Sequence, residues 1–71
     1  MWEVLVNWGE SETQEYGVIQ ASNIRQLINI LSKQLSMNDL VYDKDDSVKA
    51  TTYLITSKKH ENFYMMATKY N

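Results

Sequence analysis

The sequence predicts an α+β fold: a two-layer β-β-α-β-β sandwich in which one helix packs on a four-stranded, mainly antiparallel sheet. Three observations predict it. Apolar and polar residues alternate near the N-terminus, apolar residues recur at helical spacing in the middle, and two β-prone runs flank a short polar break near the C-terminus. With 71 residues, no proline and two glycines, the chain is long enough for one core, so we expect a single domain over residues 1–71.

The N-terminal segment WEVLVNW predicts the first strand. Its apolar residues recur at every second position, the pattern of a strand with one buried face: Trp2, Val4, Val6 and Trp8. Leu5 breaks the pattern on the polar face. Residues 9–15 are small, polar or acidic and predict a loop, and residues 16–21 (YGVIQA) then resume as a second strand. The two strands therefore form a hairpin.

The middle of the chain carries the clearest helical pattern. One face of the predicted helix holds five apolar residues, the last four at offsets of three, four, seven and eleven from the first: Ile24, Leu27, Ile28, Leu31 and Leu35. Ser22 is placed to cap the N-terminus, and Asn38 is a candidate left-handed residue at the C-terminus. Ile30 and Met37 lie off the main stripe, so we expect them at its margin.

The C-terminal third predicts a second hairpin. Residues 40–47 (LVYDKDDS) form a short extended piece that runs into an acidic turn. Residues 48–57 (VKATTYLITS) and 63–70 (FYMMATKY) are β-prone, and the five residues KKHEN join them over a length suited to a hairpin. These are the third and fourth strands of the expected sheet.

The apolar residues of this second hairpin do not alternate. Leu54 is followed by Ile55, and Met65 is followed by Met66. Because one helix covers only one face of a sheet, whichever set faces the helix leaves large apolar side chains on the other face. We expect one stripe, covered by the helix or by a partner, with these protein-interface candidates: Tyr53, Ile55, Tyr64 and Met66.

Composition and charge exclude several kinds of site. The chain has no cysteine, so neither disulfides nor thiolate zinc sites are available, and one histidine cannot build a ligand cluster. The DKDDS segment has the oxygen spacing of a calcium loop, but Val48 stands where glycine is needed and Leu54 where the bidentate Glu is needed. We therefore expect no metal and no cofactor.

The residues that could support catalysis are few and badly placed. Ser57, His60 and Glu61 lie near one another in sequence, but all three fall at the tip of a predicted hairpin, where water solvates them. A chain of this size also has little room for a cleft. We expect no catalytic residues, no enzymatic activity and no small-molecule substrate.

Nucleic-acid binding is the alternative that the sequence leaves open. Lys58, Lys59 and His60 form a basic tip, and three aromatic residues on the flanking strands could stack on bases: Tyr53, Phe63 and Tyr64. Against this, the chain has only seven basic residues and a net charge of −2, whereas phosphate binding normally leaves a basic footprint. Four glutamates lie within residues 1–24 and four lysines within residues 47–71, a segregation most simply explained by pairing inside the sheet.

The sequence therefore favours a non-catalytic protein-interaction module that acts through its sheet face or edge. It would form a homodimer, or dock on and modulate a larger protein, as a regulatory, accessory or mobile-element protein. The first residues carry no basic leader, and no apolar run approaches the length of a membrane span. We accordingly expect a cytoplasmic protein with no membrane partner.

Overall fold

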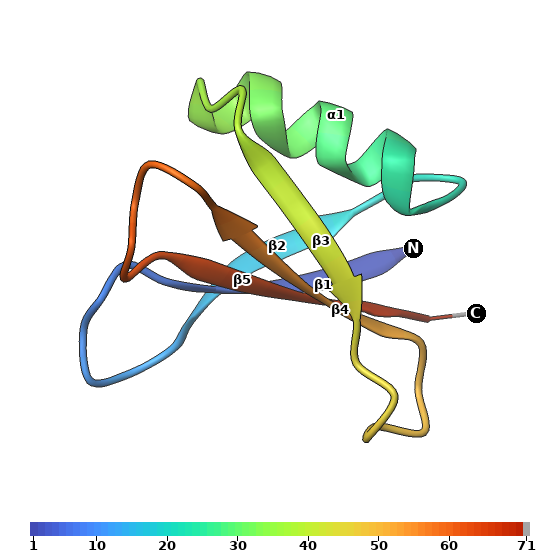
Figure 1. Cartoon of the computed structure of the whole chain (residues 1–71). Helices are drawn as coiled ribbons and strands as arrows, with labels where there is room; N and C mark the ends of the chain where they lie inside the picture. The colour runs from blue at the N-terminus through green and yellow to red at the C-terminus, as the bar shows by residue number, and fades with distance from the viewer. Residues whose placement is uncertain (71) are drawn as a thin grey trace.

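The computed structural model describes residues 1–70, and Asn71, the last residue of the predicted domain, lies outside the described residues. One helix packs on one face of a single antiparallel sheet, which makes an α+β fold (Figure 1). The strands lie in the order β2-β1-β5-β4-β3. The elements are β1 (Trp2–Asn7), β2 (Gln14–Ile19), α1 (Ile24–Leu35), β3 (Leu40–Lys44), β4 (Thr52–Ser57) and β5 (Tyr64–Lys69).

The sheet has five strands, so the prediction of four is wrong. The additional strand is β3, which the sequence indicated only as a short extended piece. It pairs antiparallel with β4, from Leu40 opposite Ser57 to Lys44 opposite Tyr53. Leu40 and Tyr42 turn toward the helix and pack against the core, which supplies the burial that such a short strand needs.

A β-bulge in β2 turns one aromatic side chain toward the helix. Val4 pairs with Gly17 and Leu5 with Glu15, so Tyr16 is the additional residue. Gly17 has a φ of 151°, a conformation that residues with a side chain rarely adopt. The Tyr16 hydroxyl donates a hydrogen bond of 2.6 Å to Oε1 of Gln34 on α1. The bulge thereby ties an edge strand to the helix.

The core lies between α1 and the helix-facing side chains of the sheet. Its members come from every layer of the fold: Trp2, Val4, Val6, Ala21, Leu27, Leu31, Met37, Ile55, Phe63, Met65 and Ala67. The Trp2 indole is fully buried and donates a 3.1 Å hydrogen bond to the Ala21 carbonyl, so its polar atom is satisfied inside the core. The Trp2 ring also lies 5.9 Å from the Tyr53 ring, centroid to centroid.

The ends of the helix differ from the prediction by one or two residues. Asn23, and not Ser22, is the N-cap: its side chain accepts a 2.9 Å hydrogen bond from the Gln26 backbone N–H. The helix ends at Leu35, and its C-cap, Ser36, adopts the left-handed conformation expected at Asn38. Met37 then turns into the core and is buried there, although the sequence predicted it at the margin of the helix's apolar stripe. No helix within residues 1–70 is long and apolar enough to cross a membrane.

Leu31 offers a direct test of this packing because its side chain is completely buried. We expect Leu31→Ala to lower the free energy of unfolding by about 2–5 kcal/mol, through lost apolar burial and the cavity left behind. Asn29→Ala, on the exposed side of the same helix, should change it by less than about 0.5 kcal/mol. Urea unfolding followed by circular dichroism measures both. A loss below about 1 kcal/mol for Leu31→Ala would contradict the packing.

Candidate functional site

The face of the sheet opposite α1 has no covering element among the described residues (Figure 1). Strand alternation and the pairing register assign its side chains. We call this surface the open face, and it comprises Glu3, Leu5, Asn7, Glu15, Val18, Val41, Asp43, Thr52, Leu54, Thr56, Tyr64, Met66 and Thr68. Three of its apolar side chains are substantially exposed: Val18 at 56%, Leu54 at 40% and Val41 at 38%.

An apolar row crosses the centre of the open face. Leu5 on β1 and Leu54 on β4 are both register partners of Met66 on β5, so the three side chains lie side by side. Leu5 and Met66 are half-buried and Leu54 is exposed. A row of large apolar side chains on a solvent-facing sheet is unusual, because an uncovered face of an antiparallel sheet is normally polar.

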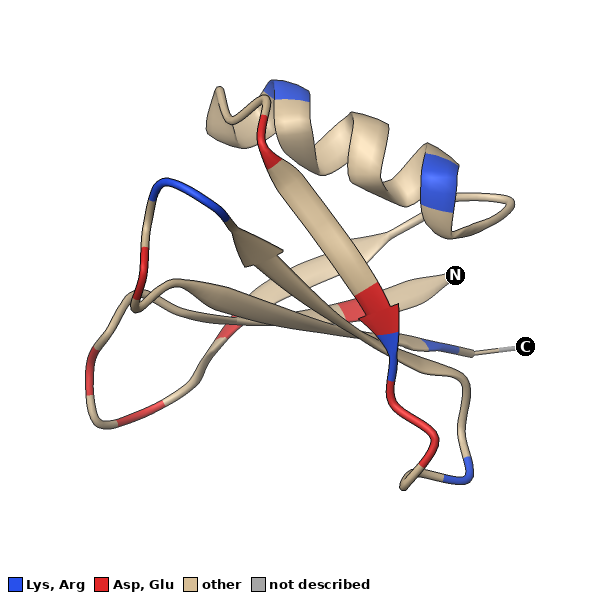
Figure 2. Ribbon diagram, in the orientation of Figure 1, with Lys and Arg blue, Asp and Glu red and all other residues tan. Residues whose placement is uncertain are grey.

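The charges on the open face are all negative. Glu15 is the register partner of Leu5, and Asp43 is the register partner of Leu54, so a carboxylate stands at each end of the apolar row. Glu3 lies on the same face. The two lysines in strands, Lys44 and Lys69, alternate to the other face, where the Lys69 ammonium lies 6.0 Å from the centroid of the Trp2 ring. Figure 2 shows the remaining lysines and arginine on the helix and in the loops.

The acidic character of one edge of this face affects a neighbouring tyrosine. The Tyr70 hydroxyl donates a 3.0 Å hydrogen bond to Oε1 of Glu3. That hydrogen bond and the negative charges of Glu3 and Glu15 raise the pKa of Tyr70 above its ordinary value. The Glu3 and Glu15 carboxylates therefore place negative charge near Tyr70.

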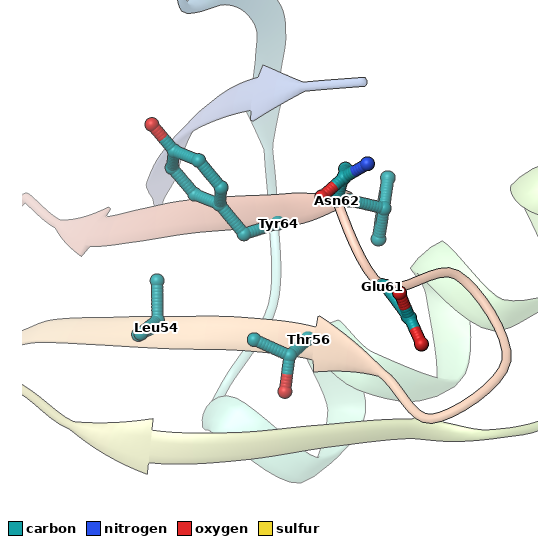
Figure 3. A pocket seen from close by; sticks show the side chains of 6 residues that line it. Leu54, Thr56, Glu61, Asn62 and Tyr64 are labelled. Carbon is teal, nitrogen blue, oxygen red and sulfur yellow. The ribbon is translucent and has the colours of Figure 1, made fainter. Parts of the chain in front are cut away.

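A shallow hollow of about 490 Å³ opens on the same face, over β4 and β5. Two residues of β4, one of β5 and three of the connecting loop line it: Leu54, Thr56, Glu61, Asn62, Phe63 and Tyr64 (Figure 3). Its lining includes both apolar side chains and hydrogen-bonding groups.

The four predicted interface residues do not form one stripe. The register pairs Ile55 with Met65 and Leu54 with Met66. Tyr53 and Ile55 therefore face the helix, and Ile55 is fully buried in the core. Tyr64 and Met66 lie on the open face. Leu5 and Leu54 complete the row that contains Met66. In the sequence both residues stand out because they break the alternation of apolar and polar residues, but only the pairing register of the strands shows that they share a face.

Phe63 does not lie where base stacking would need it. It is in phase with Met65, so its ring turns toward the helix layer and is only 4% exposed, with its centroid 4.8 Å from that of the Trp8 ring. Lys58 and Lys59 are exposed in the β4–β5 loop, as expected of a hairpin tip. The expectation that the Phe63 ring is available for stacking is therefore wrong, whereas Tyr64, a second stacking candidate, lies on the open face. Nucleic-acid binding stays a prediction.

Ser57 and His60 do come together, but not in the arrangement of a catalytic pair. The Ser57 hydroxyl donates a 2.6 Å hydrogen bond to Oδ2 of Asp39 and lies 3.0 Å from Nδ1 of His60. Its proton is directed at the Asp39 carboxylate and not at the imidazole, as it would be in a serine–histidine pair. The same Asp39 oxygen accepts a 2.8 Å hydrogen bond from the Lys59 backbone N–H. These bonds anchor the β4–β5 loop to the residue before β3.

No group of three or more candidate metal ligands occurs within residues 1–70. In the DKDDS segment, Oδ1 of Asp45 accepts hydrogen bonds from both the backbone N–H and the hydroxyl of Ser47. These bonds lower the pKa of Asp45 and engage oxygens that a cation would require. The segment is a hydrogen-bonded turn.

Comparison with protein-family models, with curated proteins and with solved structures finds no match to this chain. The open face is therefore identified as the candidate site by its own geometry. Its distinguishing features are an exposed apolar row, a carboxylate at each end of that row, and one hollow.

The Asp39 anchor generates a prediction about protonation. The pKa of Asp39 is lowered from 3.8, chiefly by the hydrogen bond from Ser57 and next by that from the Lys59 backbone. We expect Ser57→Ala to raise the pKa of Asp39 toward its ordinary value, measured by ¹³C NMR of the side-chain carboxyl during a pH titration. The pKa of Asp45 is the internal control and should not move.

The sign of the linked stability effect follows from that lowered pKa. Because the pKa of Asp39 is lower in the folded than in the unfolded chain, the ionised carboxylate stabilises the fold at pH values above 3.8. This stabilisation is lost as the pH falls through the folded pKa. An Asp39 pKa that is the same in Ser57→Ala and in the wild type would contradict the anchor.

Proposed function

We propose that this chain is a non-catalytic docking module that binds a different, larger protein through the open face. The observation that carries the proposal is the apolar row Leu5–Met66–Leu54, which runs across an uncovered sheet face with Glu15 and Asp43 at its ends. Exposed apolar patches rimmed by polar groups are typical of protein-binding surfaces.

The charges on the open face favour a different protein over a second copy of this chain. A two-fold axis parallel to the strands would set Glu15 of one copy opposite Asp43 of the other. An axis across the strands, centred on the row, would set each carboxylate opposite itself. Both arrangements bring like charges together, which disfavours self-association through this face.

The same charges define the chemistry of the partner. Its contact surface should be apolar in the centre, to cover the row, and should carry lysine or arginine at the rim, to meet Glu15, Asp43 and Glu3. Burial of the row supplies affinity at roughly 25 cal/mol per Å² of apolar area, less the cost of association. Met66 is unbranched and flexible, so it adapts to the shape of the partner.

We also propose that the chain is an accessory protein of the cytoplasm. A chain of 71 residues that binds through one face is suited to modulate or assist a larger protein, in keeping with the accessory role that the sequence favours. The cytoplasmic location is the one expected from the sequence.

Affinity capture with charge-matched variants tests the docking face. Tagged wild type, Leu54→Lys and Asn29→Lys are each incubated with lysate of the source cell, and bound proteins are quantified by mass spectrometry. Leu54 is an exposed residue of the open face, and Asn29 is an exposed residue of α1, so both variants add one positive charge at a solvated position. We expect one protein to bind the wild type and Asn29→Lys, and to bind Leu54→Lys at least tenfold less, because a lysine there places charge in the apolar contact.

Two results would count against this function. A protein retained equally by Leu54→Lys does not bind through the open face. A protein lost equally from both folded variants depends on the helix surface as much as on the open face, which also contradicts docking through the open face alone. Circular dichroism of each variant shows whether the fold is intact.

A further inference from the structure

The hollow on the open face has a composition that suits one type of side chain. Leu54 and Tyr64 extend from neighbouring strands, while Asn62 and Glu61 lie at the end where the loop joins them (Figure 3). Its volume of about 490 Å³ lies within the range of pockets that bind small ligands. One part of the hollow is therefore aromatic and aliphatic, and the other is polar.

The aromatic side of the hollow is held in place. The Tyr64 hydroxyl lies 3.1 Å from Oγ1 of Thr13, and Thr13 in turn accepts a 3.4 Å hydrogen bond from the Asn7 amide. These bonds tie the end of the Tyr64 side chain to β1 and to the β1–β2 loop. A fixed ring loses little conformational freedom when a ligand stacks on it.

The polar side of the hollow carries negative charge. Glu61 is the one charged residue among those that line it, and Asp43 adds a second carboxylate next to Leu54. Neither Lys58 nor Lys59 lines the hollow, although both belong to the same loop. Thr56 and Asn62 add oxygens that accept hydrogen bonds. An anionic ligand would meet repulsion here.

We propose that the hollow receives an arginine side chain of the docking partner, an inference that rests on the proposed function of the open face. A guanidinium is planar, so it stacks on the Tyr64 ring, and its N–H groups donate to the Glu61 carboxylate and to nearby oxygens. Its aliphatic stem packs along Leu54. Arginine satisfies the aromatic, aliphatic and acidic parts of the hollow together, whereas the compact ammonium of lysine lacks the planar fork.

An NMR titration with blocked amino acids tests this inference without knowledge of the partner. The ¹⁵N-labelled chain is titrated with N-acetyl-arginine amide, with N-acetyl-citrulline amide, which has the same shape without the charge, and with N-acetyl-lysine amide. We expect saturable shifts for the arginine compound at the backbone amides of the hollow, with weaker binding of the other two. The amides are those of Leu54, Thr56, Glu61, Asn62 and Tyr64.

Two variants assign the binding to named groups. Glu61→Gln should weaken binding of the arginine compound about two- to fivefold, the effect of losing one solvated ion pair. Tyr64→Leu should weaken it to a similar extent, through loss of the ring. Asp46→Asn, which removes an exposed carboxylate from the turn at the opposite end of β4, is the matched control and should bind as the wild type does.

The inference is overturned if no saturable shifts appear, if citrulline or lysine binds as tightly as arginine, or if Glu61→Gln binds as the wild type does. Such a failure is distinguishable from failure of the docking function. If Leu54→Lys still abolishes capture of the partner, the open face remains the docking surface and only the arginine site is wrong. If arginine binds the hollow but capture survives Leu54→Lys, the docking function is wrong.

Discussion

A single twelve-residue helix is the only helix that the described chain provides to cover a five-stranded sheet. The helix is about 18 Å long at 1.5 Å per residue. Five strands spaced about 4.8 Å apart span roughly 19 Å, and a helix with its side chains is about 10–12 Å wide, so one helix can cover at most one face of the sheet. The opposite face has no covering element within residues 1–70. The division into a packed core and the open face follows from this limit.

The strand edges of the sheet are less available for binding than its open face. At one edge, the bulge at Tyr16 disrupts the regular row of backbone hydrogen-bonding groups on β2. At the other, β3 is short and ends in Asp43 and Lys44. Bulges, short edge strands and charged residues are the features by which proteins avoid edge-to-edge pairing. Of the two modes that the sequence left open, sheet face or sheet edge, we therefore propose the face.

Local patterns in the sequence predicted most of the elements, because each such pattern reports on a few neighbouring residues. The stripe through Leu27 and Leu31 and the alternation at Trp2 and Val4 both correspond to buried residues. The strand β3 was missed because its pairing partner, β4, follows an acidic turn, and its burial depends on packing against the distant core. Neighbouring residues carry no information about such a contact.

The candidate site was predicted only in part, for a related reason. The neighbours Leu54 and Ile55, and likewise Met65 and Met66, showed that both faces of the second hairpin are apolar. Which residues share a face depends on the register, and a shift of one residue moves every side chain of a strand to the other face. The hollow combines two strands with a loop, so it becomes visible only in the folded chain.

Site-specific photo-crosslinking in the source cell tests most directly whether the open face binds a different protein. A benzophenone amino acid replaces Leu54 in one sample and Asn29, on the exposed side of α1, in the other. We expect irradiation to yield a covalent adduct with one other protein from position 54 and none from position 29. Adducts of equal yield from both positions, or an adduct from position 54 that consists of two copies of this chain, would contradict the claim.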